Sequence, residues 1–274
     1  MSLPRGAVNV GIFHAAPHLS IDEFKQRILD FADAVTALPI SQKHYSGFEI
    51  IFQNPSQPLR LRYLGALGIP TPSPQPTAWI VSECATFAQQ SEISRDPTFI
   101  EILHGAAETI WDPTTAEVFS LHMHPFIEPT VPSSTSGINT TSGINKPTSR
   151  MLAAFRRPPT LPHDTFHEKM LEFAGKLAGL PISQDNLLGY SLGTPHTVME
   201  PELRGLGFPP PPPSSAMHDL VLAFHEFQDE DRVIEWITHL EIQTFAAEFS
   251  EGLGGQDRTS VFVAEVVTKI NDKA

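Results

Sequence analysis

Leu38-Pro-Ile-Ser-Gln42 recurs unchanged as Leu180-Pro-Ile-Ser-Gln184, 142 residues further along a chain of 274 residues. The same shift aligns residues 13–47 with residues 155–189 and gives 14 identities in 35 positions without a gap. Self-similarity at a fixed spacing is the signature of a repeated structural unit. The sequence therefore predicts two copies of one unit.

The repeat also sets the expected domain boundaries. We expect a first unit over residues 1–126 and a second over residues 150–274. The segment between them, residues 127–149, is rich in Ser, Thr, Pro and Gly and contains Ser-Gly-Ile-Asn twice. Such a composition buries too little apolar surface to order itself, so we interpret it as a flexible linker.

Hydrophobic periodicity predicts the same order of elements, β-α-β-β-α-β, in both units. Ser20, followed by Glu23, forms a capping box that starts the first helix, and Pro97 is typical of the first turn of the second. We expect strands at 8–14, 47–52, 78–84 and 117–124, then at 151–156, 187–193, 217–224 and 259–268, with helices of the second unit at 163–178 and 229–249.

This order predicts an α+β fold made of two ferredoxin-like units. Each unit has helices on one face of its sheet and leaves the other face apolar and bare. Packing the two bare faces against each other buries both. We therefore expect the units to pack sheet to sheet as an intrachain dimeric α+β barrel, and the protein to be a monomeric internal pseudodimer.

Composition excludes several classes of function. Eighteen Lys and Arg against 31 Asp and Glu leave a net charge of −13, which disfavours nucleic acid and anionic membranes as partners. A single cysteine, Cys84, allows no intrachain disulfide. No stretch is apolar enough for a signal peptide or a membrane span, and we expect a cytoplasmic protein. Nucleotide-binding glycine motifs are absent, and we expect no cofactor.

The stretch Pro17-His-Leu-Ser-Ile-Asp-Glu-Phe24 resembles the start of EthD-like proteins in the dimeric α+β barrel superfamily. The later stretch from Phe87 to Asp96-Pro97, with the helix and strand after it, is similar to the second half of that family's unit. The resemblance implies a small-molecule pocket between sheet and helices in each unit. It also implies cofactor-free oxygenase, cyclase or isomerase chemistry on apolar or polyketide-type compounds.

One family feature is missing. EthD-like proteins carry a His-x-Pro signature near the end of the first helix, and its position falls at or beside Ala32 and Ala174. An activity that depends on that histidine is therefore in question here. A non-catalytic binding or scaffold protein that kept the fold is the alternative to an enzyme.

Two histidines on the fourth strand are candidate catalytic residues. Alternation along a strand places Ser120, His122 and His124 on one face. Two imidazoles suit a metal or a proton relay. A metal needs a third ligand, and His14 on the first strand lies too far along the antiparallel pair, so we expect no metal. Histidines in a polar seam or at a strand end are the structural alternative.

The third strand supplies the last candidates. Glu83 alternates with Trp79 and, in a pocket, could act as a general base; a solvent-facing strand-end acid is the alternative. The expected catalytic set is therefore His14, Glu83, His122 and His124. The residues expected to bind substrate are Asn9, Trp79, Ser120, Tyr190 and His218. Haem binding, which would need one histidine alone in a large apolar pocket, is a further alternative.

Overall fold

The chain contains both helices and strands in the computed structural model, which describes residues 6–53, 76–107, 109–128, 149–208, 220–252 and 259–271. The first half contains β1 (Ala7–His14), α1 (Ile21–Thr36), α2 (Pro39–His44), β2 (Tyr45–Gln53), β3 (Thr77–Cys84), α4 (Phe87–Ser94), α5 (Pro97–Ala107) and β4 (Glu117–Ile127). The second half contains β5 (Ser149–Arg156), α6 (His163–Gly179), α7 (Pro181–Asn186), β6 (Leu187–His196), α8 (Glu200–Gly205), β7 (Leu220–Phe227), α9 (Glu230–Thr238), α10 (Leu240–Gly252) and β8 (Thr259–Asn271).

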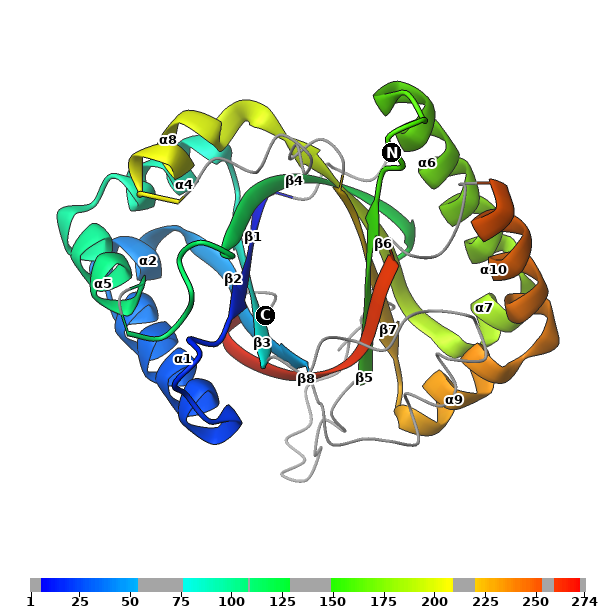
Figure 1. The fold of residues 1–274 in the computed structure, drawn as a ribbon, viewed down its shortest axis with the longest axis horizontal. Coiled ribbons are helices and arrows are strands. Elements are labelled where there is room, and N and C mark those ends of the chain that lie inside the picture. Colours follow the sequence, from blue (N-terminus) through cyan, green and yellow to red (C-terminus); the bar gives the residue numbers. More distant parts are fainter. Residues whose placement is uncertain are drawn as a thin grey trace, which may run out of the picture.

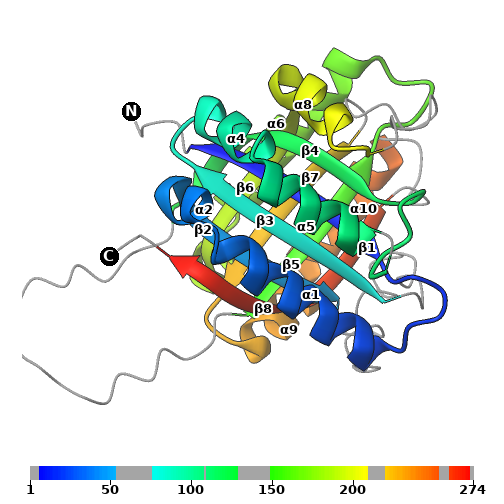
Figure 2. The ribbon, with the colours of Figure 1, turned by 90° about the vertical axis from the view of Figure 1, so that its left-hand side faces the viewer.

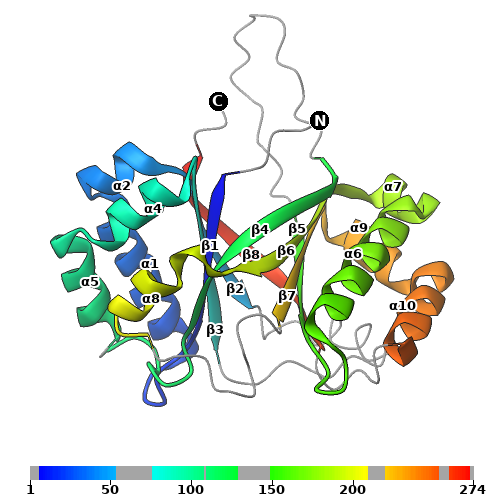
Figure 3. The ribbon, with the colours of Figure 1, turned by 90° about the horizontal axis from the view of Figure 1, so that it is seen from above.

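The eight strands form a closed antiparallel barrel in the order β1-β3-β2-β8-β5-β7-β6-β4. Helices lie outside it in two groups, on opposite sides (Figures 1 and 3). Two seams, β2 with β8 and β4 with β6, join strands from different halves of the chain. The expected α+β barrel with outer helices is thus present.

The structure corrects one detail of this expectation. Two separate sheets packed face to face would leave four edge strands with unpaired backbone groups. Instead the edges pair at both seams, for example Ile51 with Val266 and His122 with Thr194. Closure satisfies these backbone donors and acceptors and removes the edges.

Apolar side chains form three layers. The barrel interior is filled by residues of both halves, among them Val10, Trp79, Phe119 and Leu222. The outer faces pack against the helices in two further clusters, one for each group of helices. Figure 2 shows α1 and α5 lying across the outer face of the first-half strands. Each strand therefore has one face toward the barrel interior and one toward helices.

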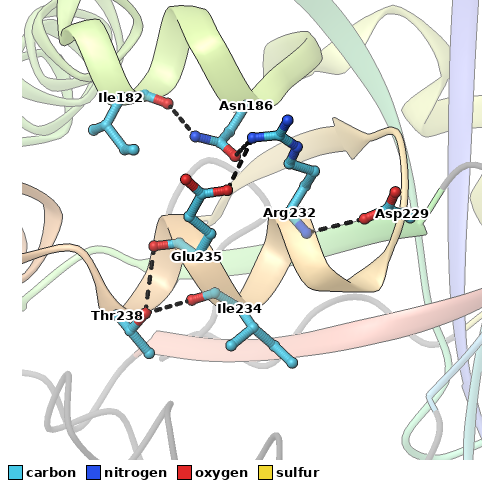
Figure 4. Close-up of polar contacts among 7 residues, drawn as sticks. All are labelled: Ile182, Asn186, Asp229, Arg232, Ile234, Glu235 and Thr238. Atoms are coloured by element: carbon cyan, nitrogen blue, oxygen red, sulfur yellow. Dashed lines mark hydrogen bonds and ion pairs between the residues drawn. The ribbon is translucent and has the colours of Figure 1, made fainter.

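The repeated Leu-Pro-Ile-Ser-Gln motif forms the short helices α2 and α7. Each begins with its proline, whose fixed φ suits the first helical turn and whose missing N–H leaves no donor unpaired. Ser183 of α7 is buried and accepts a hydrogen bond from Trp236 Nε1 at 3.0 Å. Arg232 of α9 donates to Asn186 Oδ1 at 3.4 Å, and to Glu235 at 2.9 Å (Figure 4). These bonds fix α7 on α9.

Most predicted elements agree with the structure within a few residues, and one helix does not. Ser20 and Glu23 form the predicted capping box at the start of α1. The helix predicted over residues 229–249 is two helices, α9 and α10, with a break at His239, which has extended backbone angles. Pro97 begins α5 as predicted.

Helix α8 belongs to the second half of the chain but packs on the first half. Its residue Leu203, with Met199 and Leu206 beside it, lies in the apolar cluster of the first-half helices. Figure 1 shows α8 beside α4, away from the other helices of the second half. No helix in the described part of the chain is long and apolar enough to cross a membrane.

Candidate functional site

A cavity of about 70 Å³ lies between the first-half sheet and the helices that cover it, and we call it the helix-side cavity. Its floor comes from β1, β2, β3 and β4, and its walls come from α1, α4 and α5. The lining residues are Asn9, Gly11, Phe13, Phe31, Val35, Tyr45, Phe48, Ile80, Ser82, Gln90, Ser94, Phe99, Leu103, Val118, Leu203, Leu206 and Phe208.

Polar side chains lie in the floor and one wall of this cavity, and Ser120 lies just outside its lining. Asn9 on β1 pairs across the strands with Ser82 on β3 and with Ser120 on β4. Ser120 Oγ donates to Asn9 Oδ1 at 2.6 Å, and Gln90 Nε2 of α4 donates to Ser82 Oγ at 3.0 Å. These four residues are all buried. The Oε1 atom of Gln90 is also buried and has no hydrogen-bond partner among the described residues.

The lining of the helix-side cavity carries no charge. None of its residues is Asp, Glu, His, Lys or Arg. Its one titratable side chain, Tyr45, is fully buried, and burial together with the nearby Cys84 thiol raises the pKa of the phenol well above its usual value. The pKa of Cys84 is raised to about 12, chiefly by burial. Both groups are neutral at physiological pH.

The segment around α8 forms the roof. Leu203, Leu206 and Phe208 line the cavity from above. Ser91 Oγ and Arg95 donate to the Glu202 carboxylate on α8. The roof of a first-half cavity therefore comes from the second half of the chain and is held by polar contacts to α4.

The predicted catalytic histidines of β4 lie outside this cavity. His122 is exposed and His124 is half-buried on the outer face of the β4–β6 seam. Their rings are 4.6 Å apart, and His124 Nε2 is hydrogen-bonded to Thr194 Oγ1 at 3.1 Å. Burial, and then the charges of His122 and His167, lower the pKa of His124. Phe119 and Leu121 face the barrel interior, as the predicted alternation requires.

His14 lies at one end of the barrel. Its Nδ1 is hydrogen-bonded to Thr77 Oγ1 at 2.9 Å, and Arg156 donates to Glu117 at 2.6 Å nearby. Burial lowers the pKa of His14, and the carboxylate of Glu117 opposes that shift. The register of β1 with β4, in which Ile12 pairs with Glu117, places His14 beyond the start of β4 and away from His122. This separation agrees with the predicted one.

Glu83 lies at the opposite end, in a second cavity of about 110 Å³ that we call the barrel-mouth cavity. Arg150 also lines this cavity and contacts two of its acidic residues. Arg150 donates to Glu49 and forms an ion pair with Glu226 at 3.0 Å. Trp79, expected to bind substrate with Glu83 nearby, is instead buried in the apolar middle of the barrel. The four predicted catalytic residues therefore occupy three separate places.

The corresponding space in the second half is filled by aromatic rings. Where Asn9 pairs with Ser82 in the first half, Met151 pairs with His225 in the second. His225 stacks on Tyr190 with ring centroids 4.6 Å apart, and both are buried. Burial lowers the pKa of His225 to about 4. His218, the other residue expected to bind substrate in this half, lies outside the described residues.

Sequence reasoning missed Gln90, Ser82, Tyr45 and Arg150. Ser82 alternates with Ile80 on the outer face of β3, so a polar residue in an apolar strand pattern was a usable signal. Gln90 lies on α4, a helix that no pattern predicted. Within the described residues, no group of three or more His, Cys, Asp or Glu side chains is placed to hold a metal ion.

Comparison with known proteins identifies the fold and no family. Neither a protein-family model nor a curated protein matches the sequence. A "Putative monooxygenase" from Fusobacterium nucleatum has a similar structure, with a TM-score of 0.57 at 10% identity, over 98% of this chain and 96% of that chain. An "anthrone oxidase-like protein" gives 0.56 at 9% identity, over 97% and 94%. A "putative monooxygenase" from Lactobacillus acidophilus gives 0.50 at 6% identity, over 97% and 96%. At these identities the likeness concerns the α+β barrel fold alone.

Proposed function

We propose that this protein binds a small, neutral, apolar or aromatic compound in the helix-side cavity. The observation that carries the proposal is the uncharged lining: phenylalanine and aliphatic side chains surround a strip of hydrogen-bonding groups that includes Asn9, Ser82 and Gln90. Small-molecule sites combine apolar walls with a few placed polar groups in this way. A charged ligand would lose its hydration without gaining an opposite charge.

The size of the cavity limits the compound. A volume of about 70 Å³ accommodates one small ring only with some movement of the lining. The α8 segment is the part whose displacement would enlarge the space, because Leu203, Leu206 and Phe208 form the roof. Larger polycyclic compounds therefore require α8 to shift.

Binding is tested by titrating the protein with toluene and following backbone amide signals by NMR. We expect saturable shifts at residues of β1, β3 and α4. Val118→Phe fills the cavity and abolishes them. The matched control is Val81→Phe, the same substitution in the barrel-mouth cavity, which leaves them unchanged. Toluene shifts that persist in folded Val118→Phe would overturn the proposal.

A second candidate function is oxidation of the bound compound without a cofactor. Its support is the fold shared with proteins named as monooxygenases and as anthrone oxidase-like. The assay is oxygen consumption by metal-free protein supplied with anthrone. Val118→Phe should abolish the oxygen uptake if the chemistry occurs in the helix-side cavity.

The catalytic roles of His14, Glu83, His122 and His124 stay predictions. If no oxygen is consumed, the non-catalytic binding function is favoured.

The finer classification is also proposed. We assign the chain to the EthD-like group as a tandem duplication of ferredoxin-like units, residues 1–126 and 150–274, with residues 127–149 as linker. The support is the repeat at 142 residues and the similar order of strands and helices in the two halves, apart from α8, which lies between β6 and β7 of the second half alone. Because the barrel closes within one chain, we expect a monomer in solution. The cytoplasmic location stays a prediction from the sequence. Sedimentation equilibrium checks the monomer.

A further inference from the structure

We infer that Gln90 makes the helix-side cavity specific for compounds that carry a neutral hydrogen-bond donor, a hydroxyl or an uncharged N–H group. This inference rests on the proposed binding function and adds the chemical class of ligand to it. Gln90 is 3% exposed and lines the cavity, and its Oε1 has no hydrogen-bond partner among the described residues.

The side chain of Gln90 is held in place from one end. Its Nε2 donates to Ser82 Oγ at 3.0 Å, so the amide cannot rotate freely. Its backbone N–H donates to Thr86 O in the first turn of α4, and Thr86 and Gln89 form the capping box of this helix. Gln90 therefore presents a preoriented carbonyl oxygen from a capped helix.

An unpartnered buried acceptor favours a ligand that can donate to it. Leaving a buried carbonyl unpaired costs free energy, and a ligand hydroxyl in contact with it recovers much of that cost. An ether or a plain hydrocarbon at the same place recovers none. The site therefore favours ligands with a hydrogen-bond donor, because a ligand without one leaves the carbonyl oxygen of Gln90 unpaired.

Because the lining carries no charge, it favours neutral donors over charged ones. An ammonium group also donates, but no carboxylate lines the cavity to balance its charge. A hydroxyl or an uncharged amine donates without bringing a charge into an apolar space. The expected ligands are therefore neutral donors on an apolar body.

The test compares four one-ring probes with the full-length protein by isothermal titration or NMR. Phenol donates through O–H and aniline through N–H, anisole has the oxygen without the hydrogen, and toluene has neither. We expect phenol to bind about tenfold more tightly than anisole, matching a net difference of about 1.4 kcal/mol. Aniline should exceed toluene by a similar factor.

Gln90→Met removes the acceptor and keeps an unbranched side chain of similar length. We expect this variant to bind phenol and anisole equally and to keep its affinity for toluene. Gln26→Met makes the same substitution at an exposed residue of α1 that does not line the cavity, and it should leave the phenol preference unchanged. If Gln90→Met does not fold, the comparison of probes on the wild-type protein still decides.

The outcomes separate this inference from the function on which it rests. Equal binding of phenol, anisole and toluene by the wild-type protein overturns the role of Gln90 but does not contradict the proposed binding function. Tighter binding of anisole than phenol overturns it too, because the amide would then present its NH₂ group. Absence of binding by all four probes overturns both.

Discussion

Arg95, which caps the C-terminal end of α4, donates a hydrogen bond to Glu202 on α8 at 2.7 Å and joins segments 107 residues apart in the chain. Glu202 also accepts from Ser91 at 3.0 Å. These contacts hold a short helix of the second half over the cavity of the first half. Access to the cavity therefore depends on an element whose attachment can be weakened by mutation.

Leu203→Ala is expected to loosen α8 more than it destabilises the whole protein. Leu203 is 5% exposed and packs in the first-half cluster, so its loss costs about 2 kcal/mol or more locally. Hydrogen exchange of α8 should accelerate at least tenfold, and toluene should dissociate faster. Val198→Ala, 49% exposed beside the same helix, is the control and should change neither rate.

Arg150→Met is expected to destabilise the barrel strongly at neutral pH. The Arg150 side chain is only 18% exposed, and its removal leaves Glu49 and Glu226 without their cation inside the barrel mouth. Losing one partner of a buried ion pair costs about 3–5 kcal/mol. Urea denaturation at pH 7 measures this loss.

Lys176→Met, which breaks an exposed pair with Glu172, is the control for Arg150→Met and should change the free energy of unfolding far less. Similar costs for the two variants at pH 7 would show that Arg150 contributes no more than a surface pair.

Acidification is expected to destabilise the fold through His225. Its pKa is about 4 in the folded protein and 6.5 in the unfolded chain, so the unfolded state binds the proton first as the pH falls. Stability from this residue is complete above pH 6.5 and is lost progressively between pH 6.5 and pH 4. Between pH 7 and pH 5 the loss is about 2 kcal/mol.

His225→Phe should remove that share of the pH dependence while keeping the stack on Tyr190. The measurement is urea denaturation of both proteins at pH 7 and pH 5. His14 and His124, whose pKa values are also lowered, contribute a remaining slope of the same sign. An unchanged slope in folded His225→Phe would contradict the prediction.

His122→Ala is expected to leave ligand binding within about twofold of the wild-type protein. His122 is exposed on the outer face of the β4–β6 seam and does not line the helix-side cavity. Asn9→Ala, by contrast, removes a lining residue and should weaken phenol binding. A tenfold or greater loss of ligand affinity in His122→Ala would indicate that the binding site includes His122 on β4, as the sequence pattern predicted.

Local features of the fold were predictable because nearby residues cause them. The capping box of Ser20 and Glu23 needs only four consecutive positions. Alternation along β4 predicted that Ser120 and His122 face away from Phe119. The break at His239 was not predicted, although the buried apolar positions shift phase between Ile237 and Ile242, which one continuous helix does not accommodate.

The candidate site was only partly predictable. Asn9 and Ser120 were expected to bind substrate, and the structure puts Asn9 in the cavity floor with Ser120 hydrogen-bonded to it. Gln90 and Leu203 reach the same space from helices that no periodicity indicated. Their positions depend on packing between segments far apart in the chain.

The sequence by itself determined the repeat, the approximate strands and the alternating faces of β4, because periodicity and capping act over a few residues. The tertiary structure alone decided how the sheets join, which of the polar residues meet, and that α8 covers the other half's cavity. Barrel closure brings together residues more than 100 positions apart, such as Arg150 with Glu49. Such pairs depend on strand register and on packing between distant segments, which no local sequence pattern determines.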